Sequence, residues 1–154
     1  MAIKGNQTLV LVESDDIKNF IKQYLKDGVM LRGLNYKIDD NDNKYICRYD
    51  PISIGIILDN VASNSIKSGS DELKISFSDN NKDVCISFSD NGTGLNPNIN
   101  PNKLFELGIS TQKGTGFGMG LHQIKKLVEK DMKGTVKIDT SYTDGFKLVV
   151  CIPK

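Results

Sequence analysis

Four glycines at alternate positions precede a helical pattern near the end of the chain: Gly114, Gly116, Gly118 and Gly120. Apolar residues recur at helical spacing over about 117–132, which predicts a helix where the glycines end. Because the free N–H groups of a glycine loop and of a helix N-terminus both attract anions, this junction is typical of a phosphate site. The Rossmann fingerprint would follow the first strand of a βαβ unit, and the Walker pattern needs GK[ST] after the glycines. The chain meets neither condition, so both folds are disfavoured.

Length and charge limit the function classes. The chain has 154 residues, which is enough for one domain with a substantial core. Its 20 Lys and Arg against 19 Asp and Glu leave a net charge of +1, which disfavours nucleic acid as a partner. No apolar stretch approaches the roughly 20 residues that cross a bilayer, and no export signal is found near Met1. We expect one cytoplasmic domain over 1–154 without membrane contact.

The three cysteines lie far apart in strand-like runs, without a CxxC pair: Cys47, Cys85 and Cys151. In a chain without an export signal, we expect all three to be reduced and buried thiols. One histidine in the whole chain leaves a structural zinc site very improbable.

Hydrophobic periodicity predicts helices over about 15–29, 51–67 and 117–132. The second helix is the best marked, because Asp50 can accept hydrogen bonds from the free amides at its start and Pro51 is tolerated at the first helical position. Strand-like runs are paired by polar turns into three expected hairpins, 35–40 with 44–49, 72–78 with 83–89, and 134–141 with 145–152. A further strand is expected at 8–14. Strands interrupted by helices predict an α/β (α+β) two-layer sandwich.

The second helix carries Asn60, Asn64 and Lys67 at i, i+4 and i+7, so the three side chains share one face. Two amide oxygens suit Mg²⁺, and a nearby lysine can neutralise phosphate charge. Taken alone, this pattern is more typical of a solvated helix face.

A second candidate lies where a strand ends, at Asp90-Asn91-Gly92-Thr93-Gly94. A carboxylate held at a strand end can accept a hydrogen bond from a ring amine, and the glycines permit close backbone approach. A plain Asp-Asn-Gly turn explains the same residues equally well. The Gly-, Asn- and Pro-rich segment 91–115 that begins here is long and irregular, as functional loops often are.

In order, these segments resemble the N, G1, F and G2 boxes of the GHKL (Bergerat) ATP-binding family. The matching residues are Asn60-x-x-x-Asn64-x-x-Lys67, Asp90-x-Gly92-x-Gly94, Leu104-Phe105 and Gly114 to Leu121. The resemblance covers about Tyr49 to Pro153, and the four boxes together are far more specific than any one of them. It implies a Bergerat fold, a mixed sheet with three helices on one face, and ATP with Mg²⁺ as the bound species.

The resemblance also implies a role for each matching residue. Asn60 and Asn64 would hold Mg²⁺ against the phosphates, which Lys67 would approach, and Asp90 would accept a hydrogen bond from the adenine amine. Gly92 and Gly94 would shape the pocket wall. The G2 residues Gly114, Gly116, Gly118, Gly120 and Leu121 would form the phosphate cradle. The segment from about 95 to 115 would be the ATP lid, with Phe105 as its anchor and Lys113 as a further phosphate contact.

The N box has an alternative register, in which Asp59-Asn60 is the second position. Ile56 and Ser63 would then occupy the other two slots, whereas the later register fills every slot, so we adopt the later one. Several branches of the family, including gyrase, Hsp90 and MutL, carry a Glu base where this chain has Asn60. An amide cannot accept a proton at neutral pH, which favours the histidine-kinase branch.

A whole histidine kinase would carry a phospho-acceptor histidine upstream, yet the only histidine of the chain is His122, after the glycines. The resemblance therefore implies the catalytic domain of a larger protein, C-terminal in it, or a separate partner to one. The expected partners are a phospho-acceptor histidine domain and a response regulator, and the isolated chain is expected to be monomeric. Two alternatives stay open: a nucleotide-switched interaction module, and a GHKL ATPase with slow hydrolysis.

Overall fold

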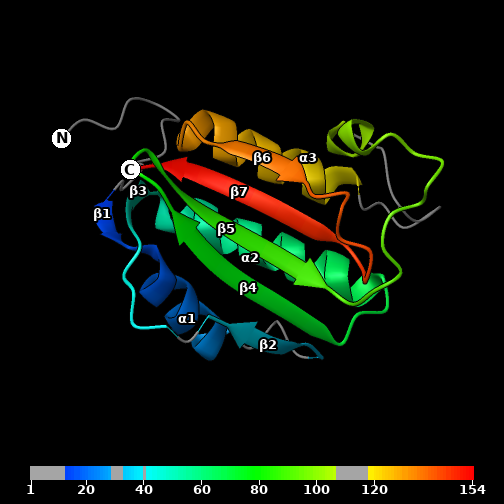
Figure 1. Ribbon diagram of the computed structural model, residues 1–154, viewed down its shortest axis with the longest axis horizontal. Helices are drawn as coiled ribbons and strands as arrows, with labels where there is room; N and C mark the ends of the chain where they lie inside the picture. The colour runs from blue at the N-terminus through cyan, green and yellow to red at the C-terminus, as the bar shows by residue number, and fades with distance from the viewer. Residues whose placement is uncertain (1–12, 29–32, 40, 107–117) are drawn as a thin grey trace, which may run out of the picture.

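The computed structural model describes residues 13–28, 33–39, 41–106 and 118–154 (Figure 1). The helices are α1 (Ile17–Asp27), α2 (Pro51–Lys67) and α3 (Gly118–Lys126), with a 3₁₀ helix, η2 (Pro101–Phe105), and a π-helical turn after α3, η3 (Leu127–Asp131). The strands are β1 (Glu13–Asp16), β2 (Asn35–Ile38), β3 (Ile46–Tyr49), β4 (Glu72–Asp79), β5 (Asp83–Asp90), β6 (Thr135–Ile138) and β7 (Lys147–Pro153).

Five of these strands form a mixed sheet in the order β2-β4-β5-β7-β6. The β2–β4 pair is parallel and the other three pairs are antiparallel. Two of the expected hairpins, β4–β5 and β6–β7, are confirmed. In the first, the Asn80 side chain accepts hydrogen bonds from the N–H groups of Lys82 and Asp83, which closes the turn.

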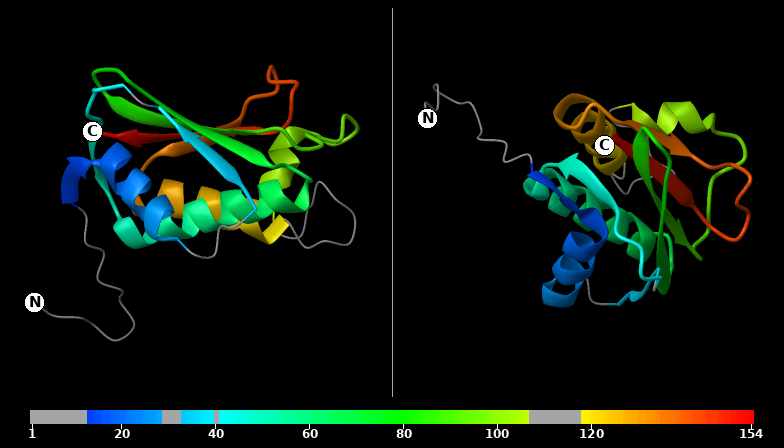
Figure 2. Two further views of the ribbon diagram at one scale, coloured as in Figure 1. Left: turned by 90° about the horizontal axis from the view of Figure 1, so that it is seen from below. Right: turned by 60° about the vertical axis from the view of Figure 1, so that its left-hand side comes forward.

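The three α-helices cover one face of this sheet, as Figure 2 shows from two directions. Residues alternate between the two faces of each strand, so one side of β5 places Val84, Ile86 and Phe88 in the core. The helices contribute Ile21, Leu58, Ile124 and other apolar side chains from the opposite side. The expected two-layer α/β sandwich, with a mixed sheet and three helices on one face, is confirmed.

Local signals explain where α2 begins and ends. The Asp50 side chain accepts a hydrogen bond from the N–H of Ile52 at the N-terminus, where Pro51 occupies the first turn. At the C-terminus, the N–H of Ser68 bonds to the carbonyl of Asn64, and Gly69 follows with φ of +81°. The predicted helix 51–67 is therefore confirmed.

The expected hairpin between 35–40 and 44–49 is wrong. β2 pairs with β4, with Asn35 opposite Glu72, whereas β3 pairs with β1 in a separate two-stranded sheet. The polar segment between them is tied to α1 instead of closing a turn, because the Lys18 ammonium donates to the backbone carbonyl of Asn41 at 2.6 Å. Turn residues predict a change of direction but do not choose the partner strand.

The cysteine expectation is also wrong for two of the three residues. Cys85 on β5 and Cys151 on β7 lie directly opposite each other and form a disulfide. The sequence separation of 66 residues hid this pairing, because only the β5–β7 register brings them together. Cys47 is a buried free thiol, as expected.

In the part of the chain that the structure describes, none of the helices combines the length and the apolar character that crossing a membrane requires.

Candidate functional site

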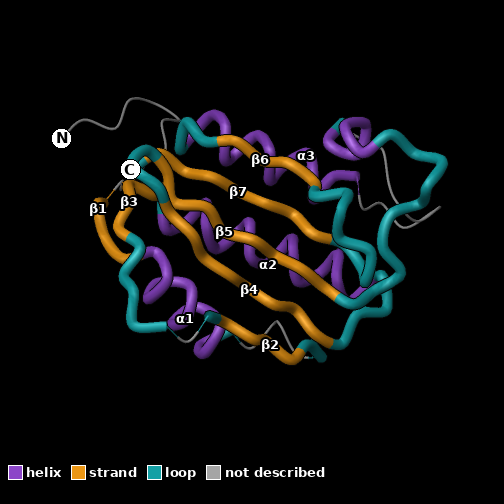
Figure 3. The backbone as a smooth tube through the Cα atoms, viewed as in Figure 1, coloured by secondary structure: helices purple, strands orange, loops and turns teal. Residues whose placement is uncertain are grey.

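The predicted binding residues collect toward one end of the sheet. In Figure 3, the loops that follow α2, β5 and β6 lie together at the right-hand end. Asp90 ends β5 here, and the second half of α2 runs toward the same end. Candidates from two separate sequence segments therefore lie toward the same end of the sheet.

Asn60 and Asn64 lie one turn apart on α2, and the first turn of α3 approaches both of them. A methyl group at Gly120 would lie 3.4 Å from Oδ1 and Nδ2 of Asn64 and 3.7 Å from Oδ1 of Asn60. The Asn60 Nδ2 donates to Oε1 of Gln123 at 2.9 Å. Its Oδ1 is therefore the atom that faces Gly120. Paired amide oxygens beside a helix N-terminus fit a hydrated Mg²⁺ with phosphate oxygens.

The structure describes some, but not all, of the other candidate residues in the N and G2 boxes. Lys67 is exposed in the last turn of α2. Gly118 begins α3, and Leu121 is buried within it. Lys113, Gly114 and Gly116 lie outside the described residues, as does the C-terminal half of the expected lid.

The Asp90 carboxylate is 4% exposed and is held by three donors. Oδ1 accepts from the backbone N–H groups of Gly92 and Phe146, both at 3.0 Å, and Oδ2 accepts from the Ser65 hydroxyl at 2.9 Å. A carboxylate oxygen accepts about two hydrogen bonds, so Oδ2 can take a further donor. This arrangement suits recognition of an amine by a fixed anion.

The two glycines after Asp90 are required by close packing and by backbone geometry. A methyl group at Gly92 would lie 2.6 Å from the Ser68 hydroxyl and 2.8 Å from its carbonyl oxygen. Gly94 adopts φ of +76°, in the left-handed region that favours glycine. The turn can therefore lie flat against the end of α2.

Phe105, the predicted lid anchor, is buried at the end of η2 and contacts α3. The Lys125 ammonium lies 5.4 Å from the centroid of its ring. The His122 Nδ1 lies 3.2 Å from the Phe105 carbonyl oxygen, which joins the same two elements. The F box is thus attached to the helix that follows the glycine run.

Sequence reasoning missed the residues that hold Asp90. Ser65 follows Asn64 on α2, but a serine at this position does not by itself indicate a contact with Asp90. Tyr142, in the β6–β7 loop, donates to the Asp90 carbonyl oxygen at 2.8 Å. Burial and the nearby Asp144 and Asp90 carboxylates raise the pKa of Tyr142. Gly145 packs so closely against Asp90 that a methyl group added to it would overlap the Asp90 carbonyl oxygen, and no local sequence pattern predicts this contact.

Tyr142 and Gly145 also line a cleft of about 430 Å³ that is bordered by the residues following Asp90. Its walls come from the loop after β5 and the β6–β7 loop, and include Thr93, Leu95, Pro97 and Thr140.

Residues 49–154 match the family described as histidine kinase-, DNA gyrase B-, and HSP90-like ATPase. The chain belongs to this family. Sensor proteins of bacteria are similar to it in sequence, and catalytic domains of histidine kinases are similar to it in fold.

Two curated relatives are a sensor protein and a probable sensor kinase. The sensor protein CitS of Halalkalibacterium halodurans is 35% identical over 103 residues, which are 66% of this chain and 19% of that protein. A probable C4-dicarboxylate sensor kinase of Bacillus subtilis is 24% identical over 150 residues, 92% of this chain and 28% of that protein. The chain therefore spans less than a third of the length of these relatives.

Solved structures share the fold at low sequence identity. The catalytic domain of the histidine kinase ThkA has a TM-score of 0.74 and 19% identity, covering 93% of this chain and 97% of that one. The ATP binding domain of PrrB from Mycobacterium tuberculosis has a TM-score of 0.74 and 21% identity, with the same two coverages.

Proposed function

We propose that this chain binds ATP together with Mg²⁺ and positions the γ-phosphate for transfer to a histidine on another segment or chain. The observation that supports this most directly is the Asp90 carboxylate. It is buried, held by three donors, and joined through Ser65 to the helix that bears Asn60 and Asn64.

Each side chain has a chemical role in this proposal. Oδ2 of Asp90 accepts a hydrogen bond from the adenine amine, and Gly92 and Gly94 shape the wall beside it. Asn60 and Asn64 offer amide oxygens to Mg²⁺, which when bound neutralises phosphate charge. Lys67 and Lys113 contribute positive charge near the phosphates. The glycines from Gly114 to Gly120 allow the phosphates to approach the N-terminus of α3.

The amide at position 60 supports transfer more than hydrolysis. Asn60 cannot remove a proton from an attacking water, because its amide is not basic at neutral pH. An acceptor imidazole is already a nucleophile and needs little such help. We therefore assign this domain to binding and orientation, with slow hydrolysis in the absence of an acceptor.

The surroundings of the domain belong to the same proposal. The acceptor is a histidine-bearing domain of the same protein or a partner, and a response regulator receives the phosphoryl group afterwards. Residues 1–154 form one ATP-binding domain of a larger protein, which works in the cytoplasm, where ATP is available.

Calorimetric titration with ATP, with and without Mg²⁺, tests the nucleotide site. In Asp90→Asn, the amide oxygen can face the N–H groups of Gly92 and Phe146, while its Nδ2 faces Ser65 and meets the adenine amine donor to donor. We expect ATP affinity to fall at least tenfold, whereas Asp83→Asn, at the other end of β5, leaves it unchanged. Equal affinity in the chain and in Asp90→Asn would overturn the adenine role.

Phosphoryl transfer is tested separately with labelled ATP and histidine-bearing domains taken from the related sensor kinases. We expect label on the acceptor only when this chain is present, and little phosphate release without an acceptor. Substantial turnover of ATP by the chain alone would favour the ATPase alternative. ATP binding without transfer to any acceptor would favour a nucleotide-switched module.

A further inference from the structure

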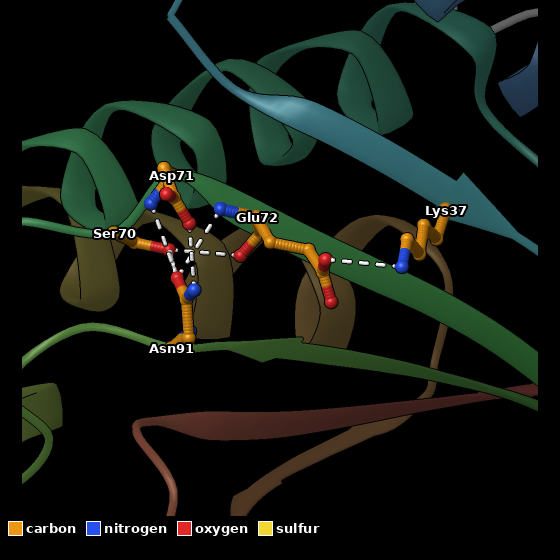
Figure 4. Close-up of polar contacts among 5 residues, drawn as sticks. All are labelled: Lys37, Ser70, Asp71, Glu72 and Asn91. Carbon is orange, nitrogen blue, oxygen red and sulfur yellow. Dashed lines mark hydrogen bonds and ion pairs between the residues drawn. The ribbon is translucent and has the colours of Figure 1, made fainter.

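Asn91, next to Asp90, is bonded to the segment that joins α2 to β4 (Figure 4). Its Oδ1 accepts from the Ser70 hydroxyl at 2.7 Å and from the N–H groups of Asp71 and Glu72 at 3.1 and 3.2 Å. Its Nδ2 donates to the Asp71 carboxylate at 2.6 Å. One side chain therefore makes four polar contacts with three consecutive residues.

These contacts begin where the β4–β5 ladder stops. Leu73 and Asp90 are the last residue pair of the ladder. The next residues, Glu72 and Asn91, are not paired as strand residues. The Asn91 side chain instead accepts a hydrogen bond from the N–H of Glu72, the residue that would stand opposite it if the ladder continued. An ion pair of 3.2 Å between Glu72 and Lys37 ties the same end of β4 to β2.

We propose that Asn91 is a positioning residue for the Asp90 carboxylate, an inference that rests on the proposed role of Asp90 in adenine binding. Asp90 meets α2 through Ser65, and Gly92 meets the end of α2 through Ser68. The backbone N–H of Thr93 donates to the Ser68 carbonyl at 3.0 Å, and a side chain at Gly92 would overlap Ser68, so the turn after Asp90 packs directly against the end of α2. By holding the α2–β4 segment against the end of β5, Asn91 keeps Oδ2 of Asp90 aimed where the adenine amine arrives.

A purely structural role and a positioning role for Asn91 lead to different effects on nucleotide binding when the side chain is removed. If Asn91 only holds the loop, its loss would lower the stability of the fold and weaken the binding of all nucleotides to the same extent. Loss of Asp90 alignment weakens ATP more than inosine triphosphate, which carries an oxygen in place of the 6-amine. The ratio of the ATP and inosine triphosphate affinities is therefore the deciding measurement.

The experiment measures both affinities by calorimetry for the full chain, with thermal unfolding alongside. We expect Asn91→Ala to lower ATP affinity about fivefold, the loss of one net hydrogen bond, and to lower the affinity ratio. Asn81→Ala, an exposed residue of the β4–β5 turn, serves as the matched control and changes neither.

An exchange of partners keeps the test valid if Asn91→Ala folds poorly. Asn91→Asp alone sets a carboxylate beside Asp71 and should weaken ATP binding. Adding Asp71→Asn restores a donor and an acceptor at the same two positions and the same net charge, so we expect the affinity ratio to return. The proposal is overturned if the ratio in Asn91→Ala, or in Asn91→Asp, stays at the wild-type value while Asp90→Asn lowers it. If Asp90→Asn itself leaves the ratio unchanged, the proposed function is what fails.

Discussion

The Ser65 hydroxyl donates a 2.9 Å hydrogen bond to Oδ2 of Asp90, and both side chains are buried. This bond joins the last turns of α2 to the end of β5 across 25 positions of sequence. It couples the helix that carries the Asn60–Asn64 pair to the carboxylate proposed to read adenine.

Ser65→Ala should lower the free energy of unfolding by about 1–3 kcal/mol, because a buried carboxylate oxygen loses a donor. The matched variant is Ser63→Ala, two residues earlier on the same helix, for which we expect a change within about 0.5 kcal/mol. Urea denaturation at pH 7 measures both. Equal stability of the two variants would show that the Ser65–Asp90 bond contributes nothing.

Gly120→Ala should separate ligand binding from stability. The added methyl meets Asn64 at 3.4 Å, an ordinary contact, and alanine is the better helix former by about 0.5–1 kcal/mol. We therefore expect unchanged or slightly higher stability, with a fall of at least tenfold in affinity for ATP with Mg²⁺, since the methyl covers the amide oxygens. Unchanged affinity would mean that the nucleotide does not use this face.

Gly92→Ala supplies the contrasting variant. Its methyl would lie within 2.8 Å of two Ser68 atoms, one of them backbone, so the turn must move. We expect stability to fall by about 1–3 kcal/mol and ATP affinity to fall with it. Thermal unfolding and calorimetry should thus show that Gly92→Ala lowers both stability and ATP affinity, whereas Gly120→Ala lowers only ATP affinity.

Thiol titration in denaturant tests the Cys85–Cys151 disulfide. We expect one reactive thiol per chain, Cys47, before reduction and three afterwards. Reduction removes a cross-link over 66 residues, which should lower the free energy of unfolding by about 2–4 kcal/mol. Three thiols in unreduced protein, prepared without reductant, would contradict the pairing.

Alkaline pH should destabilise the fold. Burial, helped by nearby Asp16, raises the pKa of Cys47 from 9.0 to about 12, and burial with Asp59 raises the pKa of Tyr36 from 10.0 to about 12. Between about pH 9 and 12 the folded chain keeps the Cys47 and Tyr36 protons, whereas the unfolded chain loses them. The free energy of unfolding is therefore at its full value below about pH 9 and falls as the pH rises toward 12. Urea denaturation at pH 7 and 10.5 measures the loss, and Cys47→Ala should make it smaller. An equal loss in that variant would rule out the thiol as a cause.

Much of the fold was open to prediction because its signals are local. The Asp50-Pro51 start of α2, the helical spacing of Asn60 and Asn64, and the placement of Asp90 at a strand end all depend on residues within one or two turns. Backbone preferences and side-chain periodicity act over that range, so a sequence alone determines them.

Tertiary structure decided which distant segments meet. β3 pairs with β1 instead of β2, Cys85 faces Cys151, and Ser65, Gly145 and Phe146 surround Asp90. Each of these contacts follows from sheet order and from the packing of α2 on the sheet, which depend on burial summed over the whole core. The sequence alone determined the elements and the candidate residues; only the assembled sheet and helices determined what holds the candidate residues in place.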